Sequence, residues 1–542
     1  MKSLTIICIL VNVSFLYSQQ EASVFLYIQN KLYNKPYTIT DSVSKQAIFD
    51  NFYSKFKPYI VLDSVKQKDN NFYYYHSFLP KKINIIITDS QKNNVLIKRT
   101  SPHILSNVFS DIINKYENIG YPFAYVELDS IYLTQKNITA CYIINLFTYF
   151  TYDSIDIIGK LLVKKSFIHS YLNIKPGKEY KERDVKQIDK HLALLPFYKI
   201  SKASEIYFIN NKAKPRIFLE KNNANQFYGL VGFGSSENRQ FAINGDLYFS
   251  LNNMLKQADS WQIQWKKTDA FSQNLHLEAN LPYIFSNPIG ISGLFSLKKQ
   301  DSSFLNLRYR IGLNFYIKGF NGLMLFAEKR QTNIFRIVLQ DIAPVSATFA
   351  GISFSYKQLN NLILPTNGYS TVFSIAYGKK QLKRTNHLHQ SIIEKFQNQS
   401  STITGTIYSY AYLPIKRFLL FKFIVDGGYM NVAHFQNELF RNGGSKSIRG
   451  FDEESIYSVS YIINTIEQRF VVDKNTQIFA FVDKMYYKLL NGKYDDPWSW
   501  GAGAEINTSA GLFFVSYALG SQFNQPFNFK TGKIHFGYRN NF

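Results

Sequence analysis

The feature that most constrains this chain is an alternation of apolar and polar side chains with a period of two residues, which recurs from about residue 227 to the end. The run 241–251 shows it clearly, and the runs 261–266, 275–281 and 419–427 repeat it. Such alternation places apolar side chains on one face of a β-strand and polar side chains on the other. Outward Trp, Phe and Leu on so many consecutive strands favour a membrane barrel over a soluble β-sandwich.

Apolar helices offer no alternative route into a membrane for this sequence. After the first twenty residues no stretch approaches eighteen uncharged apolar residues, and the best candidate, 140–150, is eleven residues long and contains Asn145. A chain without apolar helices enters a bilayer only as a closed β-barrel. The composition agrees, because aromatic residues reach 17% while charged residues, at 18%, fall below the usual quarter of a soluble domain.

The alternating segments are bounded by clusters of Asn, Gly, Asp, Ser or Pro, and sixteen of them can be placed in residues 223–542. They begin near residues 227, 241, 258, 274, 289, 303, 321, 346, 368, 402, 417, 456, 475, 497, 509 and 531. Their spacing fits strands of roughly 9 to 11 tilted residues with short turns and longer loops. We therefore predict a transmembrane β-barrel of sixteen antiparallel strands, with both ends of the barrel on the periplasmic side.

The first nineteen residues predict a secretory signal peptide. Lys2 precedes an apolar run from Leu4 to Leu16, and small and polar residues follow around Ser18. Cys8 lies inside the apolar run and not at its end, which argues against a lipoprotein anchor. Cys8 and Cys141 are the two cysteines of the sequence, too few for a zinc site or a disulfide framework.

A small α/β module is predicted in residues 151–222, before the barrel. Its pattern is a strand (SIDIIG), a helix (KKSFIHSYLNI), the turn PGKEY, a second helix (ERDVKQIDKHLALL) and two strands (SEIYFIN and RIFLE). In the second helix Val185, Ile188, Leu192 and Leu195 fall on one face. About seventy residues are sufficient for a modest core of their own.

Residues 80–150 show a related pattern. A strand is predicted at Ile83 to Thr88, and Leu105, Phe109, Ile112 and Tyr116 form one face of a helix. GYPFAYVEL and a second alternating strand follow. For residues 20–79 the sequence leaves open a degenerate copy of the same module or an unrelated cap.

Enzymatic chemistry is not indicated. The nine His residues are scattered without HExxH or paired-ligand spacing, and no GxSxG accompanies a plausible triad. We predict no catalytic residue, no metal and no cofactor. The formal net charge of +24 could suggest nucleic acid, but for an exported barrel the phosphates of outer-membrane lipid are the nearer anionic partner, and we expect no nucleic acid.

Five pieces of the barrel segment resemble the BamA/TamA superfamily, also called the bacterial surface antigen family. RNGGSKSIRGFDEES resembles its VRGF loop, here Ile448, Arg449, Gly450 and Phe451, and IFAFVDK, with Asp483, is similar to the strand that receives this loop. EQRF resembles the strand between the loop and its receiving strand, NNLILPTNGY resembles the proline-glycine signature of the superfamily, and GAGAEINTSAGLFFVSYA resembles its penultimate strands. The five pieces stand in the right order. The segment 151–222 looks like a POTRA domain, the periplasmic module of these insertases, and residues 80–150 resemble part of another.

The resemblance implies roles for particular residues. We call Met430 to Ser455 loop six; it is expected to fold back into the barrel lumen, where Arg449 would pair with Asp483, and Glu467 is a further lumen partner. A lateral seam is expected between the first and last strands, which glycines would weaken. They are Gly229, Gly232, Gly234, Gly532 and Gly537. The final segment, GKIHFGYRNNF, is similar to the C-terminal β-signal of barrel proteins, with His535, Gly537 and Phe542 at matching places.

Two classes of function follow from the resemblance and stay open at this point. The first is an outer-membrane assembly and insertion factor, whose POTRA domains hand unfolded outer-membrane protein clients to a barrel with a lateral gate. The second is a conduit, either a two-partner secretion pore or a porin. A loop folded into the lumen argues against a porin, and residues 21–78 lack a convincing plug helix and Pro-rich linker of a two-partner transporter. The expected location is the outer membrane of a Gram-negative bacterium, with the modules in the periplasm and room for periplasmic or inner-membrane assembly partners.

Overall fold

The computed structural model divides the chain into two compact units, which we describe separately. The first comprises residues 1–151 with 179–183 and 210–212, and the second comprises the rest. The described residues are 22–28, 31–32, 37–39, 47–52, 60–68, 71–78, 83–89, 94–100, 104–133, 137–235, 241–267, 272–300, 303–335, 342–383, 390–397, 400–508, 511–523 and 529–541. The predicted signal peptide, residues 1–19, lies outside them.

None of the described helices is long and apolar enough to cross a membrane.

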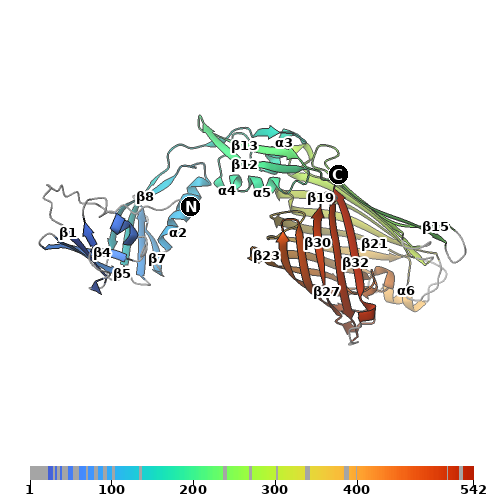
Figure 1. Ribbon diagram of the computed structural model, residues 1–542. Helices are drawn as coiled ribbons and strands as arrows, with labels where there is room; N and C mark the ends of the chain where they lie inside the picture. Colours follow the sequence, from blue (N-terminus) through green and yellow to red (C-terminus); the bar gives the residue numbers. More distant parts are fainter. Residues whose placement is uncertain are drawn as a thin grey trace. The chain divides into compact units, whose positions relative to one another are not determined.

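The second unit contains an antiparallel barrel, and the described part of the chain contributes sixteen long strands to it (Figure 1). They are β14 (Gln226–Ser235), β15 (Phe241–Asn252), β16 (Ser260–Lys267), β17 (Gln273–Leu281), β18 (Ile289–Gln300), β19 (Phe304–Lys318), β20 (Asn321–Ile334), β21 (Val345–Leu359), β22 (Gly368–Leu382), β23 (Ser401–Lys416), β24 (Leu419–Met430), β27 (Ser460–Asp473), β28 (Thr476–Lys488), β30 (Trp498–Thr508), β31 (Gly511–Ser521) and β32 (Lys533–Asn541). Every predicted strand begins within four residues of an observed one. The predicted fold class, a barrel of sixteen strands preceded by small α/β modules, is confirmed.

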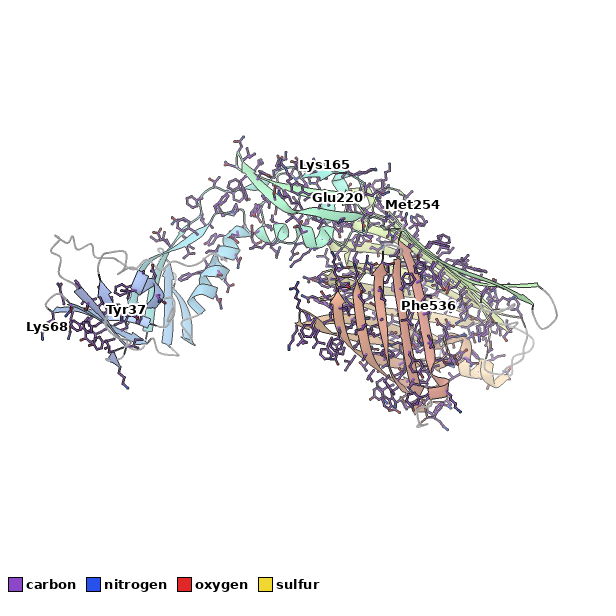
Figure 2. All side chains as sticks on the ribbon, viewed as in Figure 1. Tyr37, Lys68, Lys165, Glu220, Met254 and Phe536 are labelled. Carbon is purple, nitrogen blue, oxygen red and sulfur yellow. The ribbon has the colours of Figure 1, made fainter. Side chains whose placement is uncertain are left out.

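The alternation read from the sequence separates the two faces of the barrel wall. In β28, Phe479, Phe481 and Asp483 are buried toward the interior, while Ile478 and Val482, at alternate positions, are about half exposed on the outer face. An apolar outer face and a polar or aromatic inner face are what a bilayer requires of a barrel strand. Figure 2 labels Phe536, an outward residue of β32 that is 69% exposed.

The barrel closes at a seam between its first and last strands, and this seam is short. Among the described residues, only Gln226 with Asn541 and Phe227 with Asn540 pair across it. The neighbouring interfaces are much longer, since β14 pairs with β15 from Gln226 to Ser235. We call the β14–β32 boundary the seam, and the end at which Gln226 meets Asn541 its base.

The segment between β24 and β27 carries loop six. It contains a 3₁₀ turn, η2 (Gln436–Glu438), and two short strands that pair with each other, β25 (Phe440–Asn442) and β26 (Ile456–Ser458). The remaining short elements of the barrel region are β29 (Tyr494–Asp495), α6 (Gln390–Gln397), η1 (Ile284–Ser286) and η3 (Phe529–Thr531).

The module before the barrel has one sheet and three short helices. Its elements are β10 (Thr151–Tyr152), β11 (Asp156–Gly159), α3 (Lys165–Tyr171), α4 (Glu182–Val185), α5 (Ile188–Leu192), β12 (Tyr198–Ile209) and β13 (Lys212–Lys221). The prediction of one continuous second helix was wrong. Residues 186–187 form a turn, so α4 and α5 are separate helices. Ile188, Leu192 and Leu195 are nevertheless buried, as their spacing predicted.

Helix α3 packs against the turns of the barrel in the second unit. Phe167 and Tyr171 contact the ring of Tyr283, and the Ser286 hydroxyl donates a hydrogen bond to the Ser166 hydroxyl (2.7 Å). The module therefore meets the barrel through an aromatic cluster rather than through a bare linker.

The first unit holds two further sheets. The first comprises β1 (Ala22–Ile28), β2 (Lys31–Leu32), β3 (Tyr37–Ile39), β4 (Ile60–Lys68) and β5 (Asn71–Phe78), with a helical segment at 47–52. The second comprises β6 (Ile83–Asp89), β7 (Asn94–Thr100), β8 (Tyr125–Leu133) and β9 (Asn137–Asn145), with helix α2 (Ile104–Glu117). The strand β7 was not predicted.

The three modules share one arrangement of strands. In each, an early strand pairs in parallel with the last, as β1 does with β5, β6 with β9, and β11 with β13. The assignment of residues 80–150 and 151–222 as POTRA domains stays a prediction, and so does the choice between a degenerate copy and an unrelated cap for residues 20–79.

Candidate functional site: loop six inside the barrel

The inner faces of β27 and β28 carry the charged residues that the sequence had suggested as partners of loop six. Because side chains alternate along a strand, Thr465, Glu467 and Arg469 share the inner face of β27, and Asp483 lies on the inner face of β28. All four side chains are buried. A buried charge is costly unless it is paired and hydrogen-bonded, so each of these charged groups needs a partner inside the barrel.

Loop six brings Arg449 onto these carboxylates. The Arg449 Nε donates to Asp483 Oδ2 (2.9 Å) and Nη2 donates to Asp483 Oδ1 (2.6 Å), while Nη1 donates to Glu467 Oε1 (2.8 Å). The backbone N–H of Arg449 also donates to Asp483 Oδ2 (3.1 Å). A planar guanidinium fits a carboxylate in this two-bond geometry, which an ammonium cannot reproduce.

Asp483 and Glu467 differ in what else supports them. Asp483 accepts hydrogen bonds from the hydroxyls of Thr465 (2.7 Å) and Ser499 (3.2 Å), and among the described residues Arg449 is its one ion-pair partner. Glu467 additionally pairs with Arg469 (2.6 Å) and Lys422 (3.6 Å). Loss of Arg449 would therefore leave the Asp483 carboxylate without an ion-pair partner among the described residues, whereas Glu467 would keep Arg469 and Lys422.

The ion pairs continue beyond the loop into a network. Arg469 donates from Nη1 to Glu505 Oε2 (2.9 Å), so the described chain of contacts joins Asp483, Arg449, Glu467, Arg469 and Glu505. With Lys422, the network holds three carboxylates and three cations. Its formal charge is balanced, which is the condition under which buried ions are tolerated.

Aromatic rings of β28 lie beneath both guanidinium groups. The Cζ of Arg449 lies 3.4 Å from the ring centroid of Phe481, and that of Arg469 lies 4.8 Å from the centroid of Phe479. A guanidinium over a ring face is attracted by the ring quadrupole, which adds a favourable interaction to the ion pairs.

The remaining residues of the motif fix the loop by packing. Ile448 is fully buried in a cluster with Ile456, Ile463, Met485 and Tyr487, and Phe451 packs against this cluster. Gly450 has a φ of +84°, and a Cβ placed on it would lie 2.6 Å from the backbone nitrogen of Gly520 in β31. The loop backbone thus touches the strand backbone at a point where only glycine fits.

We expect Gly450→Ala to loosen loop six from β31. The left-handed backbone costs an L-residue roughly 1–2 kcal/mol, and forcing a methyl group against the Gly520 backbone costs roughly 1–3 kcal/mol more. The matched control is Gly492→Ala, because Gly492 has a similar φ of +86° with nothing within 4 Å of a Cβ. Denaturant unfolding of the barrel in detergent measures both variants, and equal losses would show that packing on Gly520 contributes nothing.

The structure does not pair the predicted seam glycines across the seam. Gly229, Gly232 and Gly234 lie in β14 beyond its two cross-seam pairs, and Gly537 lies in β32 without a cross-seam partner in the described register. Gly532 precedes β32 and lies against the Tyr517 ring.

The structure describes two of the three residues of the predicted C-terminal signal. His535 and Gly537 lie in β32 and pair with Ser516 and Phe514 of β31. Within the described residues, the His535 Nε2 is buried and has no hydrogen-bond partner. Phe542 lies outside the described residues.

Sequence reasoning missed Lys422 and Glu505 as members of the network. Both lie on strands whose alternation was recognised, and each carries a charge at an inward position. Period-two alternation could have flagged them as charges facing the interior. It could not have shown that they meet Glu467 and Arg469.

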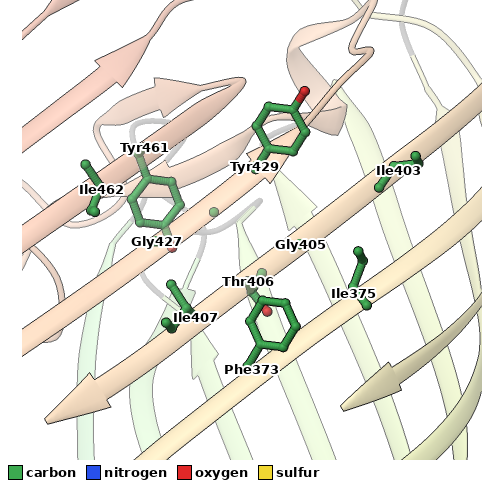
Figure 3. Close-up of a pocket in the computed structure, with 11 residues that line it drawn as sticks. Phe373, Ile375, Ile403, Gly405, Thr406, Ile407, Gly427, Tyr429, Tyr461 and Ile462 are labelled. Carbon is green, nitrogen blue, oxygen red and sulfur yellow. The ribbon is translucent and has the colours of Figure 1, made fainter. Parts of the chain in front are cut away.

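Outside the loop-six site, the described residues show one apolar groove and no metal-type cluster. The described residues include no cluster of His, Cys, Asp and Glu that could hold a metal ion. A groove of about 380 Å³ between β22 and β27 is lined mainly by apolar side chains and by Gly405 and Gly427 (Figure 3). Ile462, which lines it, is 41% exposed on the outer face, whereas the next residue, Ile463, packs beside loop six.

Comparisons with known proteins agree with this architecture. The model of the Omp85 superfamily domain matches residues 253–538, which are 286 of the 542 residues. CdiB from Acinetobacter baumannii superposes with a TM-score of 0.54 at 13% identity, over 92% of this chain and 97% of that one. CdiB from Escherichia coli gives 0.53 at 13% identity, over 92% and 97%. BamA from Haemophilus ducreyi lacking POTRA domains 1–3 gives 0.43 at 13% identity, over 82% and 94%.

No curated protein sequence matches this chain. At such low identities, the likeness to the two CdiB structures concerns the fold.

Proposed function

This chain belongs to the Omp85 superfamily, and from that premise we propose that it is an outer-membrane protein assembly and insertion factor of the BamA/TamA type. The observation that carries the proposal is the seam, where β14 and β32 share only two residue pairs. Each backbone N–H or C=O left without a partner in a bilayer costs several kcal/mol. The unpaired length of β14 is therefore a place where another strand is stabilised by pairing.

Client strands would enter by extending this edge. An exposed strand edge accepts an incoming extended chain through main-chain hydrogen bonds, and apolar and polar side chains then sort to the two faces. In this proposal the seam is the lateral gate through which the client reaches the lipid, and outer-membrane lipid surrounds the outward face. The three α/β modules would lie in the periplasm as POTRA domains.

The modules would deliver the client. In the module at 151–222, β12 (Tyr198–Ile209) pairs with β13 on one side and lies at an edge of the described sheet. Such an edge offers an unfolded outer-membrane protein a first site for strand pairing. Periplasmic or inner-membrane assembly partners could dock on the same modules.

The alternative is a polypeptide-secretion pore of the two-partner type, which the likeness to the two CdiB structures keeps open. A pore needs an open lumen, and loop six occupies this one through buried ion pairs on β27 and β28. The alternative would therefore require the loop to leave its site during transport, whereas insertion at the seam would not. This difference favours the insertion factor.

Depletion of the protein distinguishes the two functions. We expect lower amounts of many outer-membrane barrels when the protein is depleted, because an insertion factor serves clients that share only the strand edge. Quantitative proteomics of the outer membrane and of the secreted fraction is the measurement. Loss of a single secreted substrate with unchanged barrels would support the secretion pore instead.

A further inference from the structure

The tip of loop six carries the only run of three acidic residues in the sequence. Asp452, Glu453 and Glu454 follow directly after the motif that ends at Phe451. In a chain with 62 Lys and Arg residues and 38 Asp and Glu residues, such a run is surrounded by an excess of cations. The buried anchor at Arg449 fixes where the run lies.

Asp452 contacts the last strand of the barrel. Lys533, at the start of β32, donates from Nζ to Asp452 Oδ1 (2.7 Å). Lys533 lies at the end of β32 far from the base of the seam, which is at Asn541. The tip of loop six is thus tied to one side of the seam, at the end where the strands do not pair.

Glu453 and Glu454 contact strands on the other side of the seam. Glu453 Oε1 lies 3.8 Å from Lys266 Nζ in β16, and Glu454 pairs with Lys298 in β18. Arg441, at the other end of the loop hairpin, lies 3.9 Å from Glu454 and donates to Gln300, also in β18. In the barrel, β16 and β18 follow β14 and β15, so the seam lies between these contacts and the contact at Lys533.

We propose that the acidic tip, Asp452 to Glu454, is an ionic clasp that holds the seam together at the end opposite its base. Backbone pairs close the base, at Gln226 and Asn541. At the opposite end, three carboxylates of one rigidly anchored loop bind cations on β32, β16 and β18. Since the seam is the gate of the proposed function, the clasp regulates that gate and rests on that proposal for its biological role.

The ion pairs of the clasp are exposed to solvent, which suits a contact that opens and closes. The side chains of Asp452, Glu453 and Glu454 are 74%, 54% and 41% exposed, so water and salt screen each pair. Exposed pairs are individually weak, and several must act together to hold two strands. The Arg449 anchor is buried, so it keeps its place while the clasp opens and closes.

The test measures the width of the seam directly, in the full-length protein in lipid nanodiscs. Spin labels go on the outward residues Ile534 of β32 and Ile263 of β16, in a Cys141→Ser background. Distances between the labels are compared for the parent and for Asp452→Asn/Glu453→Gln/Glu454→Gln. We expect the neutralised variant to shift the distribution to longer and broader distances. Raising salt until the Debye length is about 3 Å should shift the parent in the same way.

Two further variants separate the clasp from a general loss of charge or of folding. Asp496→Asn breaks an exposed pair with Lys484 (2.6 Å) in the β28–β30 region, away from the seam, and should leave the distances unchanged. Asp452→Lys should widen the seam, and Asp452→Lys/Lys533→Asp should restore it. Faster migration of unheated protein on gels checks that each variant is folded.

The outcomes for the clasp and for the proposed function are separable. Unchanged distances in the neutralised, folded variant would overturn the clasp, whatever the variant does to clients. A widened seam with normal levels of outer-membrane barrels would support the clasp and would count against the insertion function.

Discussion

Arg449→Ala is expected to destabilise the docked loop by about 3 to 5 kcal/mol, because it removes one partner of a buried ion pair and leaves the other charge unpaired. Asp483 suffers most, since in the described structure Arg449 is its one ion-pair partner. Asp483→Ala should cost a similar amount, and both variants should lower assembly or client insertion. Unfolding of the barrel in detergent and the levels of client barrels are the measurements.

A double-mutant cycle on Arg449 and Asp483 isolates the pair from its surroundings. The double variant should be less damaged than the sum of the single variants, because neither charge then remains unpaired. A second cycle on Arg449 and Glu467 should show weaker coupling, since Glu467 keeps Arg469 and Lys422. If each single variant costs almost nothing and the costs simply add in both cycles, the loop is not docked.

Two controls calibrate this result. Arg449→Lys keeps the charge but cannot make two parallel bonds to Asp483 or cover Phe481 with a planar group, so it should rescue only part of the loss. Asp496→Asn breaks an exposed pair of similar length and should cost roughly 0 to 1 kcal/mol. A full rescue by lysine would show that charge alone matters.

The sequence predicted the barrel well because a barrel strand is specified locally. Alternation with a period of two is visible in each segment separately, and the start of β22 at Gly368 or β18 at Ile289 needs no knowledge of neighbouring strands. The same local reasoning failed in the small module, where a continuous helix was expected and a turn at residues 186–187 interrupts it. Short helices depend on tertiary packing more than on their own periodicity.

The site was only partly readable for a related reason. The motif at Ile448 to Phe451 and the residue Asp483 on the strand that receives it were predicted from the resemblance. The resemblance also implied that Arg449 pairs with Asp483. Lys422, Glu505 and Lys533 join the loop only through the register of the whole barrel, which no local pattern contains. The acidic run at the tip of loop six can be seen in the sequence, but its lysine partners on both sides of the seam cannot.

Locking the seam is expected to abolish client insertion while leaving the barrel folded. Pairing runs antiparallel, so continuing the register from Gln226 with Asn541 by four residues places Leu230 opposite Gly537. A disulfide in the oxidised Leu230→Cys/Gly537→Cys variant, made in a Cys141→Ser background, would join β14 and β32 where the structure leaves them unpaired. Directly opposed residues of an antiparallel pair have Cα atoms roughly 4.5 to 5.5 Å apart, within the range a disulfide spans.

The base of the seam supplies the matched control for this lock. Gln226 and Asn541 are already paired, so Gln226→Cys/Asn541→Cys joins strands where they already meet and should leave insertion largely intact. Client-barrel levels before and after reduction, with gel migration of unheated samples as the check on folding, compare the two locks. If the oxidised Leu230→Cys/Gly537→Cys protein inserts clients as well as its reduced form does, the seam is not the gate. The unpaired edge of β14 would then lose the role that supports the proposed function, and the secretion pore would become the better reading of this fold.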